Sequence, residues 1–296
     1  MILQVNNVNK YYNDFHAVKN LSFNVKKGGV YGILGRNGAG KTTTIRMIMG
    51  IYDPEVGEIK RNYSSNRVSY LPEERGLYPK LSLKDTLIFF GQIKGLTKQQ
   101  IDKRKDYWLN KFDLTKWYDK KIEELSKGMQ QKVQFIITAM NQPELLILDE
   151  PFSGLDPVNM QIFKDEIIKL KEQGTTVLFS SHIIEHVEYL CSNVLIINEG
   201  EKILDGTLSK IKEKHGEKTI FIDYEGDGTI LENEMVDHID NYGGYAEVFL
   251  KNPDDHDKYL ANIVGKIKIF EYRIDLPSLK SIFIDKVGEI EEGKNE

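Results

Sequence analysis

The sequence is poor in cysteine and has no long apolar run. Cys191 is its single cysteine, so no internal disulfide can form, which is typical of proteins in a reducing cytosol. No apolar segment approaches the roughly 20 residues that a membrane-spanning helix needs. The N-terminus, Met1–Val5, lacks the basic and then apolar build of a secretory signal. We therefore expect any role at a membrane to depend on a partner.

The sequence also lacks a basic excess. Its formal charge is −5, whereas nucleic-acid-binding proteins usually carry a clear positive charge, so we expect no nucleic-acid partner. Apolar residues, in contrast, make up 40% of the 296 residues. That share is enough for the core of one large domain, or of one medium and one small domain.

Strand-like and helical patterns alternate along the first two thirds of the chain. Such β-α-β alternation predicts a parallel sheet covered by helices, and hence an α/β fold. The interval from about residue 83 to residue 140 is helical and charge-rich. Strands are expected at Ile2–Val5, Leu21–Val25, Val30–Leu34, Leu145–Leu148 and Val177–Ser180, and helices at Lys41–Met49 and Val158–Glu172.

A charged stretch, Lys210–Glu217, marks a change of composition. We place a domain boundary there, giving a first domain of residues 1–215 and a small α+β domain of residues 216–296, a usual size for a domain. In the second domain, strands are expected at Thr219–Tyr224, Ala246–Leu250 and Lys266–Tyr272, and helices at Asp254–Val264 and Ser278–Val287.

The segment Gly35–Thr42 matches the pattern G-x-x-x-x-G-K-T and lies between an expected strand and an expected helix. Glycines let successive backbone N–H groups point at an anion, and the helix N-terminus adds positive partial charge. Lys41 would reach the β- and γ-phosphates, and the Thr42 hydroxyl would bind Mg²⁺. The sequence therefore predicts an ATPase that binds its phosphates with Gly35, Arg36, Asn37, Gly38, Ala39, Gly40, Lys41, Thr42 and the adjoining Thr43.

Two carboxylates follow the strand Leu145–Leu148 directly. Ligands of parallel sheets bind at the carboxyl ends of the strands, so Asp149 should face the Mg²⁺ beside the phosphate loop. Glu150, one residue on, is placed to act as the general base on the attacking water.

Further motifs occur in a fixed order across roughly residues 1 to 215. Leu125–Gln131, Ser153–Asp156, His182 and Tyr12 resemble the signature motif, D-loop, switch histidine and adenine-stacking aromatic of ABC-transporter ATPases. Taken alone, His182 indicates a surface helix cap and Tyr12 a packing or surface aromatic. The resemblance implies a P-loop NTPase with a RecA-like core, an N-terminal antiparallel β subdomain and a helical signature subdomain.

The resemblance also implies a head-to-tail dimer with an identical copy or a close paralogue. ATP and Mg²⁺ would lie between the phosphate loop of one subunit and Ser126 and Gly128 of the other, with Asp156 nearby. His182 would hydrogen-bond the γ-phosphate. Two positions depart from the family: Lys127 replaces a glycine, and Glu73 occupies the position of the Q-loop glutamine. Glu73 could bind Mg²⁺ or contact the membrane subunit, and both readings stay open.

Tyr70–Tyr78, Leu125–Lys132 and Leu276–Phe283 resemble the branch of ABC-2-type exporters similar to the NatA sodium-efflux type. This implies a motor subunit on the cytoplasmic side of the cell membrane that drives a separate integral-membrane permease. Two other classes are considered. Soluble ABC proteins of the ribosome or of DNA repair usually carry two cassettes or a long coiled-coil insertion, which this sequence lacks. A P-loop kinase would leave the signature motif and His182 as coincidences.

Overall fold

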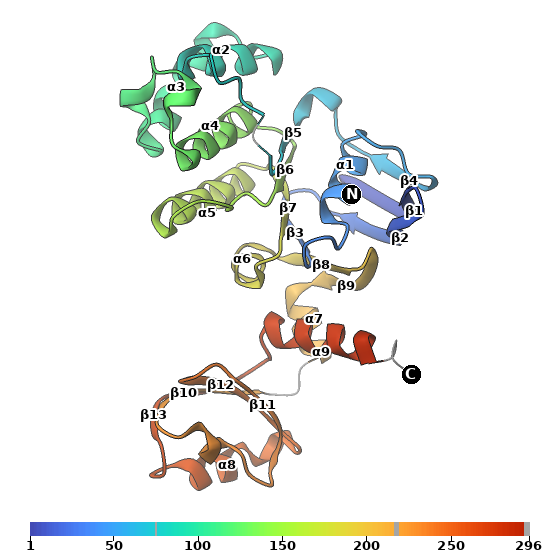
Figure 1. Ribbon diagram of the computed structural model, residues 1–296, viewed down its shortest axis with the longest axis vertical. Helices are drawn as coiled ribbons and strands as arrows, with labels where there is room; N and C mark the ends of the chain where they lie inside the picture. Colours follow the sequence, from blue (N-terminus) through green and yellow to red (C-terminus); the bar gives the residue numbers. More distant parts are fainter. Residues whose placement is uncertain (75, 216–218, 293–296) are drawn as a thin grey trace. The chain divides into compact units, whose positions relative to one another are not determined.

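The computed structural model describes residues 1–74, 76–215 and 219–292 (Figure 1). The chain divides into two units, Met1–Asp205 and Gly206–Glu296. The boundary expected after residue 215 adjoins residues 216–218, which lie outside the described residues. The division falls earlier because helix α7 (Leu208–His215) packs against α9 (Leu279–Glu292) in the second unit.

The first unit is built on a six-stranded sheet ordered β5-β6-β7-β3-β8-β9. Neighbouring strands from β5 to β8 run parallel. Leu34 on β3 pairs with Ser181 on β7, and Asp149 on β6 pairs with Ser180, so the carboxyl ends of these three strands share one edge. The strands are β3 (Val30–Leu34), β5 (Val68–Leu71), β6 (Leu145–Asp149), β7 (Thr176–Ser181), β8 (Asn193–Asn198) and β9 (Glu201–Thr207).

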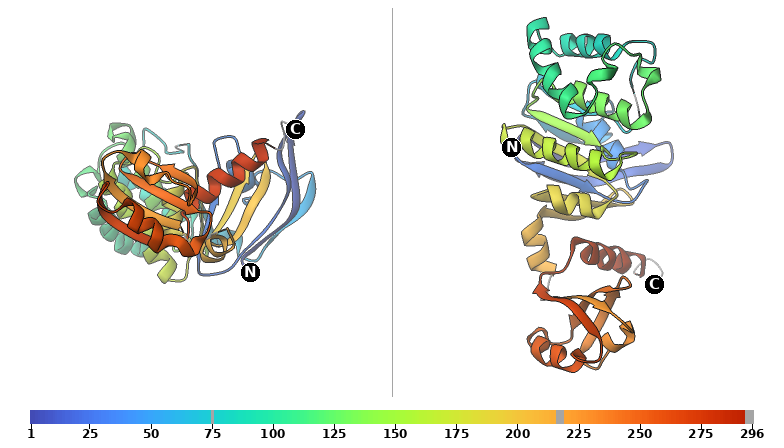
Figure 2. Two further views of the ribbon diagram at one scale, coloured as in Figure 1. Left: turned by 90° about the horizontal axis from the view of Figure 1, so that it is seen from below. Right: turned by 90° about the vertical axis from the view of Figure 1, so that its left-hand side faces the viewer.

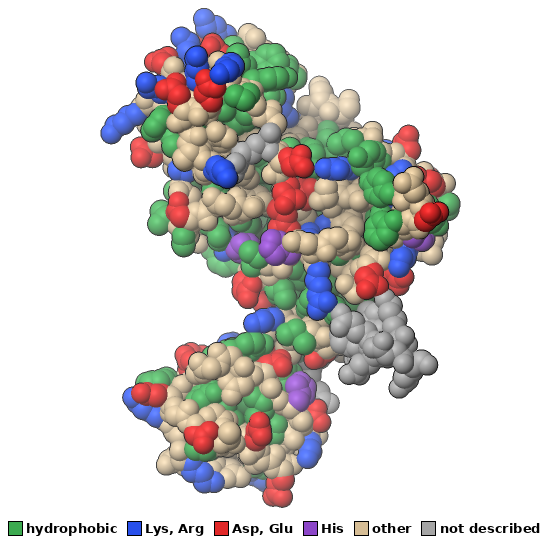
Figure 3. Space-filling model, in the orientation of Figure 1, with side chains coloured by type: hydrophobic (Ala, Val, Ile, Leu, Met, Phe, Trp, Pro, Cys, Tyr) green, Lys and Arg blue, Asp and Glu red, His purple; other side chains and the backbone are tan. Residues whose placement is uncertain are grey.

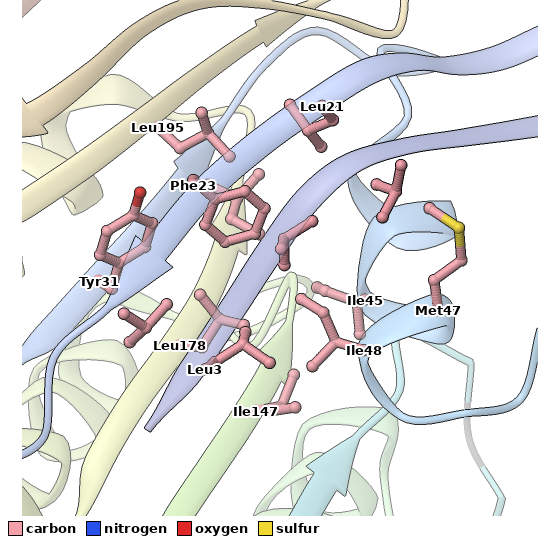
Figure 4. Packing of buried hydrophobic residues seen from close by; sticks show 14 of the residues in the cluster. Leu3, Leu21, Phe23, Tyr31, Ile45, Met47, Ile48, Ile147, Leu178 and Leu195 are labelled. Atoms are coloured by element: carbon pink, nitrogen blue, oxygen red, sulfur yellow. The ribbon is translucent and has the colours of Figure 1, made fainter. Parts of the chain in front are cut away.

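The two faces of this sheet are covered differently. Helices α5 (Pro157–Glu172) and α6 (Ile184–Leu190) lie on one face (Figures 1 and 2). On the other face lie α1 (Lys41–Ile48) and an antiparallel sheet of β2 (Phe15–Val25), β1 (Leu3–Tyr12) and β4 (Val56–Arg61). The main apolar core fills the space between them (Figure 4), with contributions from Leu3, Leu21, Phe23, Tyr31, Ile45, Met47, Ile48, Ile147, Leu178 and Leu195.

The interval expected to be helical forms α2 (Leu83–Ile93), α3 (Lys98–Lys111) and α4 (Lys127–Ala139). Each has a hydroxyl N-cap: Ser82, Thr97 and Ser126 accept hydrogen bonds from the backbone of the first turn. A buried aromatic cluster of Trp108, Phe112, Phe135 and Phe163 joins α3 and α4 to α5. None of the helices in the described ranges has the length and apolarity to cross a membrane.

The second unit has an antiparallel sheet ordered β11-β12-β10-β13 and a core against α8 (His256–Ile263). Its strands are β10 (Thr219–Glu225), β11 (Val236–Asn241), β12 (Tyr245–Leu250) and β13 (Lys268–Asp275). Three of these strands and both expected helices are confirmed within a few residues. The sequence did not predict β11, because this edge strand is largely polar and none of its residues is buried.

Candidate active site

The loop that joins β3 to α1 has the backbone that its glycines predict. Gly38 and Gly40 lie in the left-handed region, with φ of +82° and +99°. A Cβ at Gly35 would lie 2.4 Å from the carbonyl oxygen of Ile197, so a larger residue would collide with the next strand. Helix α1 begins at Lys41, which places its free N–H groups and positive partial charge at this loop.

The Lys41 ammonium is buried in the loop that it ends. Its Nζ donates to the carbonyl oxygens of Gly35 at 2.8 Å and Arg36 at 3.2 Å. The same Nζ lies 3.4 Å from Oε1 of Glu150. The structure therefore joins the loop lysine to the carboxylate that follows β6, two groups that are more than a hundred positions apart in the sequence.

Glu150 is held in an unusual position for a glutamate. Its φ is +47° and the residue is 8% exposed. The backbone N–H donates to Ser180 Oγ at 3.2 Å, and Oε2 lies 3.0 Å from Nδ1 of His182. Oε1 accepts no hydrogen bond from the described residues. Glu199 has the same φ, so it is the buried position between Lys41 and His182, together with this backbone, that marks Glu150 as a candidate catalytic group.

Asp149 is fully buried beside it. Ser180 Oγ donates to Oδ1, and the Tyr70 hydroxyl donates to Oδ2 at 3.3 Å. Burial, and then the charge of Asp149, raise the pKa of Tyr70, so this phenol stays protonated and remains a donor. Asp149 is thus fixed in orientation by donors from β5 and β7.

Two adjoining cavities open beside these groups, of about 290 Å³ and 330 Å³. Thr42 and Glu73 line both, and Asp149 lines the second, so the three expected metal ligands are brought together. On the face shown in Figure 3, acidic and histidine side chains gather near the middle of the first unit. The first cavity is lined by Tyr12, Phe15, Ala17, Asn37, Gly38, Gly40, Lys41, Thr42, Thr43, Glu73 and Glu150.

Tyr12 lies at the tip of the β1–β2 hairpin, where it pairs with Phe15. The exposed fractions are 39% for Tyr12 and 63% for Phe15. Sequence reasoning identified Tyr12 and missed Phe15, although an aromatic on each side of the Asn13-Asp14 turn was a usable signal. It also missed Tyr70 and Ser180, which reach Asp149 through neighbouring strands.

Comparison with known proteins agrees with these motifs. The family model for ABC transporters matches residues 18–153, and a model for the C-terminal domain of DrrA1-3-like ATP-binding proteins matches residues 206–287. An uncharacterized ABC transporter ATP-binding protein of Bacillus subtilis, YhaQ, is 42% identical over 98% of this chain and 100% of its own length. The chain belongs to the ABC-transporter ATP-binding proteins.

Two further similarities extend this result. The linearmycin resistance ATP-binding protein LnrL of Bacillus subtilis is 31% identical over 97% of this chain and 98% of its own length. A solved ATP-binding subunit of an ABC transporter superposes with a TM-score of 0.69 at 30% identity, covering 72% of this chain and 93% of that one. The family and the P-loop NTPase fold expected from the sequence are thereby confirmed.

In this ABC protein the signature and D-loop residues lie at the starts of α4 and α5. Ser126 caps α4 and accepts from the Met129 N–H at 3.3 Å. A Cβ at Gly128 would lie 3.8 Å from the carbonyl oxygen of Gly154 in the D-loop, and Asp156 caps α5. None of Ser126, Gly128 and Asp156 is among the residues that line the two cavities.

Exposed apolar side chains lie just beyond the Q-loop position. Tyr78, Phe89 and Ile93 are 53%, 41% and 66% exposed, and the Tyr78 ring contacts Phe89 edge to face at 5.8 Å. We call Tyr78, Phe89 and the neighbouring aliphatic Ile93 the aromatic patch. Gln134 on α4 donates to the carbonyl oxygen of Glu74 at 3.2 Å, which ties the segment before the patch to the signature helix.

Proposed function

We propose that the chain is the ATP-hydrolysing motor subunit of an exporter, acting at the cytoplasmic side of the cell membrane on a separate permease. The observation that carries this proposal is the position of Glu150. Its buried carboxylate lies between Lys41 and His182 beside the phosphate-loop cavity. A base there can reach a water next to the terminal phosphate of a nucleotide held by the loop.

Nucleotide binding would use the first cavity. The N–H groups of Gly38, Gly40 and Lys41, at the N-terminus of α1, suit the phosphates, and the Lys41 ammonium would exchange its contact with Glu150 for phosphate oxygens. Thr43 lines the same cavity. Tyr12, exposed at the cavity edge, would stack on the adenine.

The residues present fit a Mg²⁺ ion. Thr42, Asp149 and Glu73 offer a hydroxyl and two carboxylates, all oxygen donors, on the walls of one cavity. In related P-loop chemistry the metal neutralises charge on the β- and γ-phosphates. Here Tyr70 and Ser180 would hold Asp149 in the orientation that this task needs.

For hydrolysis, Glu150 would accept a proton from the attacking water. Its Oε1 accepts no hydrogen bond from the described residues, and it would become available for that proton once the Lys41 ammonium leaves it for phosphate oxygens. His182, 3.0 Å from Oε2, would keep the carboxylate aimed and contact the γ-phosphate. General-base catalysis of this kind contributes about 10²- to 10⁴-fold to a rate.

A second subunit would complete the site. Gly128 of the signature motif adjoins Gly154 of the D-loop, and Ser126, Gly128 and Asp156 all lie outside the cavity linings, as expected if they serve the nucleotide of a partner subunit. Ser126 and Gly128 lie at the N-terminus of α4, which favours phosphate, whereas Asp156 itself caps the N-terminus of α5 with its carboxylate. ATP would then bridge two subunits, and loss of the γ-phosphate would release the bridge.

The aromatic patch would be the permease-binding surface. Exposed aromatics are enriched at protein interfaces, and this patch adjoins the segment that contains Glu73. Movement at the nucleotide could reach it through Glu74 and Gln134. The similarity to a linearmycin resistance protein over nearly the whole chain favours export as the direction of transport.

The test is capture of the tagged chain from detergent-solubilised membranes. We expect co-purification of a multi-span membrane protein, and expect the variant with Tyr78, Phe89 and Ile93 all changed to Ser to lose it while keeping its ATP affinity. Val56→Ser, an exposed apolar residue on β4, is the matched control and should retain the partner. Co-sedimentation with ribosomes instead would contradict the proposal.

A further inference from the structure

A larger cavity, of about 500 Å³, lies between α3, α4 and α5. Its volume falls within the roughly 300–1,000 Å³ of small-molecule sites. None of its lining residues lines the two cavities at the phosphate loop, so it is a separate site. Figure 1 shows these three helices beside one another; Tyr107 on α3 contacts Glu166 on α5, and Phe135 on α4 contacts Phe163 on α5.

One wall of this cavity is apolar and rigid. Trp108, Ala139, Met140 and Leu170 line it, and each is at most 6% exposed. The Trp108 indole stacks on Phe112 with an interplanar angle of 6°. A flat or linear apolar body of a ligand would find a preformed surface here, which lowers the entropy that binding costs.

The buried carboxylate of Glu166 does not leave the cavity acidic. The Tyr107 hydroxyl donates to it at 2.6 Å, and Lys111 Nζ lies 3.4 Å away. Lys169 Nζ in turn donates to the Tyr107 oxygen at 2.8 Å. Glu166 is thus already hydrogen-bonded and paired with a cation, so it does not need a ligand and would not repel an anion strongly.

Positive charge remains at the rim. Lys103, Arg104 and Lys169 line the cavity with Glu166 as their single acidic neighbour in the lining. Arg104 donates to the carbonyl oxygen of Met140 and to Gln142 Oε1, which are both uncharged. In the part of the chain that the structure describes, no carboxylate lies within ion-pair distance of Lys103 or Arg104.

We propose that this cavity binds an amphipathic organic anion. Its apolar body would lie against Trp108, Met140 and Leu170, and its single carboxylate or phosphate would meet Arg104 and Lys103. A hydrogen bond between the charged guanidinium and an anion is stronger than the bonds that Arg104 now makes to two uncharged acceptors. The ligand would therefore be recognised by its charge and by its apolar length together.

A ligand bound in this cavity would also change the rate of ATP hydrolysis. A ligand would contact α4 and α5 near their C-terminal ends, at Ala139 and Leu170, whereas Ser126 and Asp156 cap the N-termini of the same helices. A shift of either helix along its axis on binding would therefore move a group that faces the partner's nucleotide. This consequence rests on the function proposed above, whereas binding itself does not.

The test uses 11-bromoundecanoate, an anionic chain whose bromine quenches tryptophan only at near contact. In a Trp117→Phe background, Trp108 is the single tryptophan. We expect saturable quenching of Trp108, and about tenfold weaker binding of the uncharged 11-bromoundecanol. Arg104→Met and Lys103→Glu should each weaken the acid about tenfold. Lys98→Glu, an exposed lysine on the same helix but outside the cavity, should not.

Equal affinity for the acid and the alcohol, or unchanged affinity in both rim variants, would overturn the proposal. The acid should also change the ATPase rate of the full chain, and Lys103→Glu should remove that effect. Quenching without any ATPase activity in the chain would refute the motor function and leave the binding site intact. Normal ATPase without quenching would refute the site alone.

Discussion

Replacing Glu150 by glutamine separates binding from hydrolysis in this structure. The amide keeps the shape of the side chain and can still hydrogen-bond His182, so the folded site should persist. It cannot take a proton from water. It also removes the negative charge that lies 3.4 Å from Lys41 and beside the position proposed for the γ-phosphate.

The expected magnitudes follow from these two losses. Removing a general base lowers a rate by about 10²- to 10⁴-fold, so turnover should fall to near background. ATP no longer has to displace Glu150 from Lys41. Desolvation of these two mostly buried side chains offsets much of their attraction, so we assign the pair about 1 kcal/mol, the upper end for exposed pairs, which corresponds to about fivefold tighter ATP binding.

The assays are phosphate release at saturating Mg²⁺-ATP, nucleotide binding by fluorescence, and gel filtration with ATP. We expect no turnover, tighter ATP binding and an ATP-dependent dimer. The matched control is Glu144→Gln, just before β6, where the carboxylate pairs with Arg67. Glu150→Gln protein that hydrolyses ATP like the wild type would refute the base assignment, and weaker ATP binding would refute the competition for Lys41.

Three further predictions concern the same unit. Glu73→Gln should leave ATP affinity nearly intact, because the amide oxygen can still bind Mg²⁺, and should alter stimulation by the permease; a large loss of Mg²⁺-ATP binding would instead show that the metal needs the Glu73 carboxylate. Tyr12→Ala should weaken ATP about fivefold in a fluorescence titration, whereas Tyr12→Phe should bind normally. Burial, and then Lys164, lower the pKa of His186, so the unfolded state binds protons more readily and stability should fall as pH drops below about 6.5. His186→Asn should shrink the difference in Tm between pH 7.5 and pH 5.5; an unchanged difference would contradict this linkage.

The sequence predicts those parts of the site whose residues are adjacent in the chain. A phosphate loop needs its glycines and lysine in one turn, because successive N–H groups must converge on one anion. The same is true of Asp149 and Glu150 at the end of β6. The strands around them follow from the alternation of apolar runs in the sequence. This pattern predicts the ends of β3, β6 and β7 to within one residue.

The residues that sequence reasoning missed reach the site through strand register. Ser180 meets Asp149 because β7 pairs with β6, and Tyr70 meets it because β5 pairs on the other side. Neither position has a distinctive local pattern, so its role depends on which strands are neighbours. That order, β5-β6-β7-β3, does not follow the sequence and could not be read from it.

Ser126 can cap α4 and donate a hydrogen bond to the partner's nucleotide at the same time. The Ser126 oxygen accepts the Met129 N–H, and this uses an acceptor of the hydroxyl while its O–H remains able to donate. A phosphate oxygen requires only a donor. Ser126 could therefore bind the partner's nucleotide without giving up the cap, so closing the dimer would not have to unwind the start of α4. The conformational entropy lost in ordering Ser126 is already lost when the subunit folds. ATP binding then has only to join the two preformed halves of the site.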